Sequence, residues 1–343
     1  MLKKFEHLLE KGRKFIENIK GGEKVVLVYD ADADGLCSAT LSLFVLKKMK
    51  KKVKCIETGF TKIEKLKTEL KRFKKIITVD VPTDLIEKHL LSLRKNMLII
   101  DHHPGKDLNS KKVVLINPRL ENPKIYQPTS YVIYKMFSDL VKEKKWVAIV
   151  GTVGDFGIED CKDLVKIKNK KNIWKNNFGR AAIFLNNSIS VLGSEKTLEI
   201  LVGLKNLKEL LKNREIITAS KKFNYEFLRC KKEYKKNLEI YGEILISKIK
   251  PKYKGICSAI ITKLSTKNPE KIIFIFEEVE KGVKIHGRSG DKKIDIGELF
   301  RKLGIGGGHE AAGAGIIDRK KEKEVKTKIL EELKNLLNIE NVS

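Results

Sequence analysis

Short apolar runs alternate with stretches of helical periodicity through the first half of the chain. The runs predict buried strands at 25–29, 53–55, 76–79 and 97–100, with one further apolar run at 147–150. Apolar residues three or four positions apart predict helices at 1–20, 36–48, 63–72, 85–93 and 131–142. Strands that alternate with helices are typical of βαβ units. We therefore expect an α/β domain with a mostly parallel sheet flanked by helices.

The pattern changes in the second half. Residues 162–180 are rich in Lys and Asn and predict an irregular insertion, followed by helical periodicity over 193–211. Residues 215–249 are charged and nearly free of Gly, and Pro251 follows them, which predicts a long helix between two domains. Strand-like runs at 256–261, 272–276 and 282–286, a glycine-rich loop at 304–315 and a helix at 320–337 predict a smaller α+β domain. We expect a domain over 1–214, a helical linker over 215–250 and a domain over 251–343.

Acidic and histidine residues follow the apolar runs of the first domain. They are Asp30, Asp32 and Asp34 after the first run, Asp80 after the third, Asp101-His102-His103 after the fourth, and Asp155 after residues 147–150. The carboxyl ends of parallel strands meet at one edge of a sheet, so these side chains should share a site. Packed carboxylates repel one another and resist burial without a cation. Oxygen and imidazole ligands suit Mn²⁺, Mg²⁺, Zn²⁺ or Fe²⁺, which favours a metal-dependent hydrolase.

Each motif taken alone has another interpretation. Asp30, Asp32, Asp34 and Gly35 fit the opening of an EF-hand loop, but Leu41 stands where that loop needs a glutamate. The same turn lacks the threonine of a haloacid-dehalogenase-type phosphatase. Asp80 could cap a helix and Asp155 could be a turn residue. Two adjacent imidazoles after a buried strand are rarely a packing solution, so the combination favours a metal site.

The four motifs together resemble those of the DHH phosphoesterase superfamily, which includes RecJ exonucleases, nano-RNases, pAp phosphatases and manganese-dependent pyrophosphatases. The resemblance implies two metal ions, usually Mn²⁺ with Mg²⁺ as an alternative. It implies that Asp80 bridges them, that Asp30 and Asp32 bind one ion, and that Asp34, His102 and Asp155 bind the other. It also implies that His103 faces the substrate as a catalytic residue beside Asp80. Many relatives have histidine at the position of Asp30, whereas RecJ-like members have a carboxylate there.

The glycine-rich segment of the second half resembles the DHH-associated domain of the same superfamily. The matching residues imply a substrate-binding role for Arg288, Ser289, Gly306, Gly307, Gly308 and His309. The chemistry fits a phosphate, because glycines expose backbone N–H groups and an arginine can make a bidentate contact. A P-loop is excluded, since no Gly-Lys-Ser/Thr follows, and no strand leads into the segment as a Rossmann fingerprint requires. A glycine-rich packing turn remains the alternative.

The net charge of the chain indicates what kind of partner it binds. The 343 residues carry 72 Lys+Arg against 44 Asp+Glu, a formal net charge of +28, which favours a polyanion such as nucleic acid. A thermophile's surface is the other source of such a composition. The basic stretch 47–52 is typical of a solvated helix end, and Trp174 and Phe178 in the basic segment 162–180 could stack on bases or pack in the core. No apolar run reaches the roughly 18 residues of a membrane span. With no signal peptide and five scattered cysteines, we expect a cytoplasmic protein with reduced thiols.

These observations together predict a phosphodiesterase, most similar to the short archaeal RecJ-like exonucleases that act on single-stranded DNA or RNA. The resemblance implies that replication or repair proteins are possible partners. The chain ends soon after the second domain, so we expect it to lack the OB-fold of bacterial RecJ, which favours the archaeal resemblance. Residues 186–194 lack the arginine of the bacterial relatives, which leaves the 5′→3′ polarity of degradation open. One alternative is a nano-RNase, pAp phosphatase or cyclic-dinucleotide phosphodiesterase acting on short substrates. The other is a non-catalytic replication scaffold.

Overall fold

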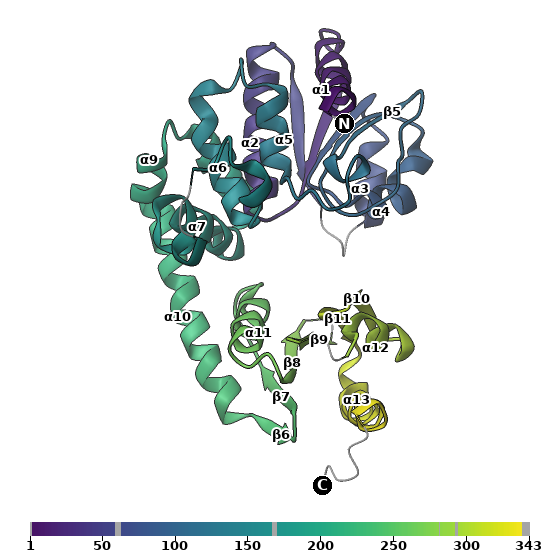
Figure 1. The fold of residues 1–343 in the computed structure, drawn as a ribbon, viewed down its shortest axis with the longest axis vertical. Helices are drawn as coiled ribbons and strands as arrows, with labels where there is room; N and C mark the ends of the chain where they lie inside the picture. Colours follow the sequence, from purple (N-terminus) through teal and green to yellow (C-terminus); the bar gives the residue numbers. More distant parts are fainter. Residues whose placement is uncertain (1, 59–62, 167–169, 281, 292–293, 338–343) are drawn as a thin grey trace. The chain divides into compact units, whose positions relative to one another are not determined.

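The computed structural model of the chain describes residues 2–58, 63–166, 170–280, 282–291 and 294–337 (Figure 1). The chain forms two compact units, Met1–Ser220 and Lys221–Ser343, and α10 (Arg214–Lys236) begins in the first and ends in the second. Within the described ranges, every helix is too short or too polar to cross a bilayer.

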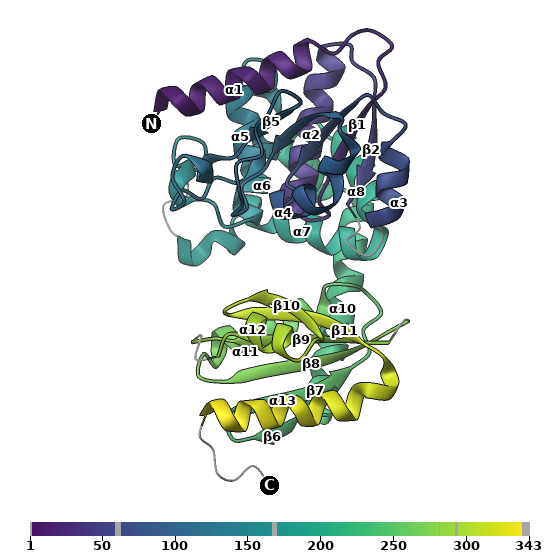
Figure 2. The ribbon, with the colours of Figure 1, turned by 90° about the vertical axis from the view of Figure 1, so that its right-hand side faces the viewer.

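The first unit is built on a five-stranded, fully parallel sheet in the order β2-β1-β3-β4-β5. Its strands are β1 (Val25–Tyr29), β2 (Val53–Glu57), β3 (Lys75–Val79), β4 (Asn96–Ile100) and β5 (Val113–Ile116). All five residues of β1 are buried because helices cover both faces of the sheet (Figures 1 and 2). Val25, Leu27 and Tyr29 belong to the core on one face, and Val26 and Val28 belong to the core on the other.

The larger core lies beneath most of the helices. These are α1 (Leu2–Glu17), α2 (Ala33–Lys48), α5 (Thr129–Met136), α6 (Lys145–Gly154), α7 (Asn177–Leu192), α8 (Ser194–Gly203) and α9 (Leu207–Lys212). The smaller core on the opposite face is covered by α3 (Ile63–Leu70), by α4 (Thr83–Leu85) and by the π-helical turn Ile86–Leu90 that continues it. The chain therefore matches the expected α/β architecture.

The strand order creates a switch point between β1 and β3. From β1 the chain passes through α2 to β2 on one side, and then through α3 to β3 on the other side. Because successive connections leave β1 in opposite directions, the carboxyl ends of β1 and β3 border a crevice, where ligands bind in open α/β sheets.

Two predictions for the first unit are wrong in part. The apolar run 147–150 belongs to helix α6, so Asp155 follows a helix and not a strand. α6 is apolar on most sides because it packs against α2, α5 and α7, and periodicity cannot distinguish such a buried helix from a strand. Residues 162–180 include a 3₁₀ helix, Lys170–Lys175, and the first turn of α7, while 167–169 lie outside the described residues.

The second unit contains a six-stranded mixed sheet in the order β10-β11-β9-β8-β7-β6. Its elements are β6 (Glu239–Tyr241), β7 (Ile244–Ile249), α11 (Ile256–Lys267), β8 (Ile272–Val279), β9 (Gly282–Ser289), α12 (Ile296–Lys302), β10 (Gly306–His309), β11 (Ala312–Ile317) and α13 (Glu322–Leu337). Among the described strands of this second sheet, only β7 and β8 pair in parallel, and α11 is the crossover between them. α12 and α13 share one core with the sheet, and α11 packs on β8 and β9.

Three predictions for this unit are corrected by the structure. Residues 256–261 are the start of α11 and not a strand. The helix predicted over 215–249 ends at Lys236, and β6 and β7 occupy most of the remainder. The glycine-rich segment 304–315 is mainly the β10–β11 hairpin and not an irregular loop.

Candidate metal centre and substrate face

Three aspartates come from the turn between β1 and α2. Asp32 is the N-cap of α2 and accepts a hydrogen bond of 2.8 Å from the backbone N–H of Gly35. A Cβ at Gly35 would lie 2.2 Å from the carbonyl oxygen of Asp30, so only glycine allows this tight turn. Asp30 accepts a hydrogen bond of 3.1 Å from the Thr58 hydroxyl, whose residue follows β2. The turn therefore holds its carboxylates at the edge of the sheet.

Asp34 is buried in the first turn of α2 and faces the start of α5. It accepts hydrogen bonds from the backbone N–H groups of Thr129 (2.7 Å) and Ser130 (3.2 Å), and from the Ser130 hydroxyl. Free N–H groups at a helix N-terminus stabilise an anion. Gly151 of α6 leaves the necessary space, because a Cβ there would lie 2.8 Å from a carboxylate oxygen of Asp34.

Asp80, His102 and Asp155 meet beside Asp34. His102 Nε2 lies 3.3 Å from Oδ1 of Asp80 and 3.3 Å from Oδ2 of Asp155. Asp80 has a left-handed backbone, with φ of 62°, and accepts a hydrogen bond of 3.0 Å from the Thr129 hydroxyl. Donor atoms of Asp34, His102 and Asp155 lie within 4.8 Å of one another, as do those of Asp80, His102 and His103. Asp30 and Asp32 are outside these two sets.

His103 is held by the buried carboxylate that precedes it by two residues. Its Nδ1 lies 2.7 Å from Oδ1 of Asp101. The amide of Asn117, which follows β5, donates a hydrogen bond of 2.8 Å to the backbone carbonyl of His103. These contacts fix the imidazole through one nitrogen and leave Nε2 available to another group.

The electrostatics of the cluster are those of excess negative charge. Burial and the Asp155 carboxylate raise the pKa of Asp34 well above its usual value, and burial and Asp34 do the same for Asp80. Burial and Asp32 raise the pKa of Asp30 to about 6, and burial raises the pKa of Asp155 to about 6. Burial and the neighbouring His103 lower the pKa of His102 to about 3, so its imidazole is neutral at pH 7.

His103 behaves in the opposite way. Burial alone would lower its pKa, but the hydrogen bond and charge of Asp101, helped by Asp155 and Asp32, outweigh burial and raise the pKa above 6.5. The two imidazoles, whose pKa values are shifted in opposite directions, stand side by side with ring centroids 4.5 Å apart. His102 is suited to bind a metal ion and His103 to donate a proton.

The residues fit divalent cations. In the described part of the chain, no lysine or arginine makes an ion pair with Asp34, Asp80 or Asp155. Arg119, which stacks on Tyr126, only moderates the pKa of Asp155. Nδ1 of His102 is buried and has no hydrogen-bond partner among the described residues. Several carboxylates around a neutral imidazole form the donor set of Mn²⁺ or Mg²⁺-type sites rather than a self-sufficient polar network.

Several contributors were not predicted from the sequence. Tyr126 donates a hydrogen bond of 2.8 Å to Oδ2 of Asp155, and Thr129 and Ser130 hold Asp80 and Asp34. A signal for Thr129 and Ser130 was present in the sequence: Pro-Thr-Ser stands directly before an apolar run of helical periodicity. Such an opening predicts a helix N-terminus, whose free N–H groups favour a nearby anion. Asp101 is part of the predicted motif, but its role in orienting His103 emerges only from the geometry.

In the second unit, the proposed substrate residues come from three adjacent strands. Arg288 of β9 pairs with Ala312 of β11, and Ala312 pairs with His309 of β10. Residues paired in register point to the same side of a sheet, so Arg288 and His309 share a face. Nε of Arg288 is buried without a partner among the described residues, and burial lowers the pKa of its guanidinium. An unsatisfied, positively charged donor favours binding of an anion. Ser289 is buried on the opposite side of the strand.

The glycines of this segment have a packing role. A Cβ at Gly287 or Gly313 would lie 2.7 Å or 3.0 Å from Cγ2 of Ile296 in α12. The carbonyl oxygen of Gly308 lies 2.4 Å from the position of a Cβ on Gly297, so the helix and hairpin approach closely. At these glycines the side-chain hydrogen is therefore required for packing between α12 and the neighbouring strands, which is the alternative that the sequence left open. A Cβ on Gly307 would meet its nearest neighbour, the Arg301 side chain, only at 3.9 Å, so this position is accessible to a ligand.

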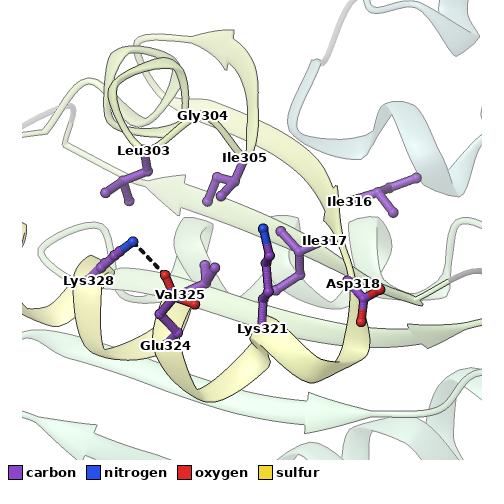
Figure 3. A pocket seen from close by; sticks show the side chains of 10 residues that line it. All are labelled: Leu303, Gly304, Ile305, Ile316, Ile317, Asp318, Lys321, Glu324, Val325 and Lys328. Carbon is purple, nitrogen blue, oxygen red and sulfur yellow. Dashed lines mark hydrogen bonds and ion pairs between the residues drawn. The ribbon is translucent and has the colours of Figure 1, made fainter.

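A cavity of about 260 Å³ lies elsewhere in the second unit (Figure 3). Its lining includes Ile305, Ile317 and Val325, with the Lys328–Glu324 ion pair at one side. None of the candidate site residues in the described ranges lines it, so we do not assign it to the substrate site.

Comparisons with known proteins identify the family. The model of the DHH family N-terminal domain matches residues 24–153, and that of the DHHA1 domain matches residues 242–338. The chain belongs to the DHH phosphoesterase superfamily. Both matched segments lie where the sequence resemblance placed them, so this prediction is confirmed. No curated protein matches the chain in sequence.

Solved structures confirm a RecJ-like fold. RecJ from Thermus thermophilus in complex with Mn²⁺ has a TM-score of 0.70 at 18% identity, over 94% of this chain and 54% of that chain. An exonuclease RecJ bound to manganese has a TM-score of 0.71 at 19% identity, covering 94% and 93%. The pGpG-specific phosphodiesterase PggH from Vibrio cholerae has a TM-score of 0.53 at 14% identity, covering 91% and 99%. This chain therefore spans about half the length of the Thermus protein.

Proposed function

We propose that this DHH-family protein is a metal-dependent phosphodiesterase, and specifically a RecJ-like exonuclease that hydrolyses single-stranded DNA, RNA or both. The observation that carries the proposal is the meeting of Asp34, Asp80, Asp155 and a neutral His102 without a cation from the described part of the chain. The two RecJ structures, which contain Mn²⁺, support the same type of metal here.

The proposed ligand assignment follows the predicted roles. Asp80 would be shared between two Mn²⁺ or Mg²⁺ ions, Asp30 and Asp32 would bind one, and Asp34, His102 and Asp155 the other. Bound divalent ions supply Lewis acidity at the phosphate and a hydroxide at neutral pH. Thr129 and Tyr126 orient two of the carboxylates through their hydroxyl groups.

His103 would act on the substrate directly. Asp101 occupies Nδ1 and raises the pKa of the ring against the effect of burial, which favours the form that carries a proton at Nε2. Such a group can stabilise charge on the phosphoryl oxygens or protonate the leaving oxygen. Arg288, with His309 on the same sheet face, would bind a further phosphate of the strand. The net charge of +28 is consistent with a polyanionic substrate.

A second candidate is a phosphodiesterase for short substrates, such as a nano-RNase, a pAp phosphatase or a cyclic-dinucleotide phosphodiesterase. The likeness to PggH extends over 99% of that protein, a coverage similar to the 93% of the manganese-bound RecJ, so both classes of relative match this chain along its length. Rates on a dinucleotide and on a long single strand separate the two candidates, because an extended basic surface accelerates only the long substrate.

The test is a time course with end-labelled single-stranded DNA, single-stranded RNA and duplex DNA in Mn²⁺, with EDTA as the control. We expect ladders of shortened products from single strands and none in EDTA. Bound Mn²⁺ without turnover of any phosphodiester would instead favour the non-catalytic scaffold. A cytoplasmic location and association with replication or repair proteins stay predictions.

A further inference from the structure

Helix α6 ends in a turn whose residues are unusual for its geometry. The backbone N–H of Phe156 bonds to the Val153 carbonyl (3.2 Å), and that of Gly157 bonds to the Thr152 carbonyl (2.9 Å). This pair of bonds defines a Schellman motif, in which the first residue after the cap adopts a left-handed backbone and is usually glycine. Here that residue is Phe156, with φ of 59°.

The phenylalanine is unfavourable there in two ways. A bulky residue in the left-handed region is strained, and Phe156 as a whole is 66% exposed to solvent. The glycine of the turn stands one position later, where it is needed for packing: a Cβ on Gly157 would lie 2.1 Å from Cδ of Pro128. The path of the turn is thereby fixed against the segment that contains Thr129 and Ser130. A single exposed apolar residue is common, but one that is also strained and rigidly placed indicates a function.

The ring has only one aromatic neighbour among the described residues. Trp174 packs edge-to-face against it, with centroids 5.0 Å apart and an interplanar angle of 81°. Trp174 and Phe178, which the sequence suggested as stacking residues, are both partly buried against the core of the unit. Phe156 is therefore the accessible aromatic of this region, held in place by Trp174.

The surroundings suit a nucleotide. Phe156 directly follows Asp155, a candidate metal ligand. Exposed basic residues lie in the adjoining segment, namely Lys162, Lys166, Lys175 and Arg180. Acids of that segment are engaged, since Asp163 binds Lys135 and the Tyr131 hydroxyl, and Asp160 accepts a hydrogen bond from the Tyr126 backbone. An exposed aromatic residue in a segment of the chain rich in exposed cations is a composition typical of single-strand binding.

We propose that Phe156 is a stacking platform for a nucleobase of the substrate, next to the metal centre. The inference rests on the proposed function and deepens it, because it states that the enzyme recognises bases by stacking and therefore requires unpaired strands. Stacking is tolerant of sequence, since every base has an aromatic face.

The experiment compares the wild type with Phe156→Ala, Phe156→Gly and Phe156→Trp, with Val202→Ala as the control. Val202 is also an exposed apolar residue of the first unit, at 39%. Each is assayed in Mn²⁺ on a single-stranded DNA and on the same DNA with abasic residues at the cleaved end. We expect Phe156→Ala and Phe156→Gly to reduce the preference for the base-containing strand by about tenfold, and Phe156→Trp and Val202→Ala to retain it.

Thermal unfolding separates a structural role from a binding role. Because glycine is favoured in this turn, Phe156→Gly should melt at the wild-type temperature or above it. A strongly lowered melting temperature, or an equal loss of rate on base-containing and abasic strands, would overturn the platform assignment and leave a purely structural role.

A binding measurement keeps the inference testable without turnover. In the Asp80→Asn background, quenching of a 2-aminopurine-containing single strand should be weaker when Phe156 is also changed to alanine. If the wild type degrades no nucleic acid, the proposed function fails, and unchanged 2-aminopurine quenching then also removes the platform. If the wild type is active but Phe156→Ala shows the full base preference, only the platform fails.

Discussion

Each unit of the molecule buries a cluster of ionisable side chains on its sheet, but the two clusters are balanced differently. In the second unit, Glu277 and His286 are buried and their Oε2 and Nε2 atoms lie 2.6 Å apart. Burial alone would raise the pKa of Glu277, but the His286 hydrogen bond and charge lower it. In the first unit, burial and mutual repulsion raise the pKa of Asp34 and Asp80. The chain neutralises one cluster itself and leaves the other to cations from solution.

Asp80→Asn removes one negative charge from the unbalanced cluster and should have the largest effect on activity. Asparagine tolerates the left-handed backbone at this position, so the change isolates the charge. We expect a loss of hydrolysis on the order of a thousandfold or more, with loss of the Mn²⁺-induced rise in melting temperature. In EDTA the variant should melt higher than the wild type, because less charge is buried. Full activity would contradict the assignment of Asp80.

Glu277→Ala applies a similar change to the balanced cluster and should have the opposite effect on stability. It leaves His286 buried without its partner, which typically destabilises by about 3–5 kcal/mol. The loss should be seen in urea unfolding both with Mn²⁺ and with EDTA. The control is Glu277→Leu combined with His286→Leu, which removes both polar side chains and should recover most of the stability. If the single variant were as stable as the wild type, the pair would not be the balanced unit described here.

His103→Ala should separate chemistry from metal binding within the first cluster. We expect kcat to fall by about a hundredfold, as for loss of a general acid, while Mn²⁺ affinity measured by calorimetry changes little. Asp101→Asn should act in the same direction and shift the alkaline limb of the pH–rate profile to lower pH, because Asp101 raises the pKa of His103. A large loss of Mn²⁺ affinity in His103→Ala would place this imidazole among the ligands.

Arg288→Ala should weaken substrate binding and leave the metal site intact. Loss of one phosphate contact predicts a rise in KM of about tenfold on a single-stranded oligonucleotide. Lys323→Ala, an exposed lysine of the same unit, is the matched control for the change in net charge. An unchanged KM in the arginine variant would remove this residue from the substrate face.

The pH dependence of the metal-free protein should show the smallest effect. The pKa values of Asp30 and Asp155 are about 6 in the folded protein, against the usual 3.8, and those of Asp34 and Asp80 are also raised well above it. These four carboxylates outweigh His102, whose pKa of about 3 acts in the opposite direction, so the folded state binds more protons than the unfolded state between pH 3.8 and 6. Stability should therefore rise as pH falls from 7 towards 4, by a few degrees in melting temperature in EDTA. With Mn²⁺ the order should reverse, because protons compete with the ion below about pH 6. A flat profile in EDTA would mean that the carboxylates are not buried together.

Much of the candidate site could be predicted because its residues lie directly after buried strands. Asp30, Asp80 and His102 each follow a run of apolar residues, and such a run is buried most readily in the interior of a parallel sheet. Because the carboxyl ends of parallel strands lie at the same edge of the sheet, these side chains were expected to lie close together. The apolar run before Asp155 was wrongly predicted as a strand. It belongs to a helix that is buried on several sides, and over four residues the apolar pattern of such a helix is the same as that of a buried strand.

The amino-acid sequence by itself determined the α/β class of the first unit, the family motifs and the excess of positive charge, because apolar patterning and local spacing are properties of the linear chain. Only the tertiary structure decided which polar groups meet. The N-terminus of α5 reaches Asp34 across 95 positions of sequence, Asp101 orients His103, and Phe156 is exposed while Trp174 is partly buried. Those outcomes depend on packing between distant segments, which no local pattern encodes.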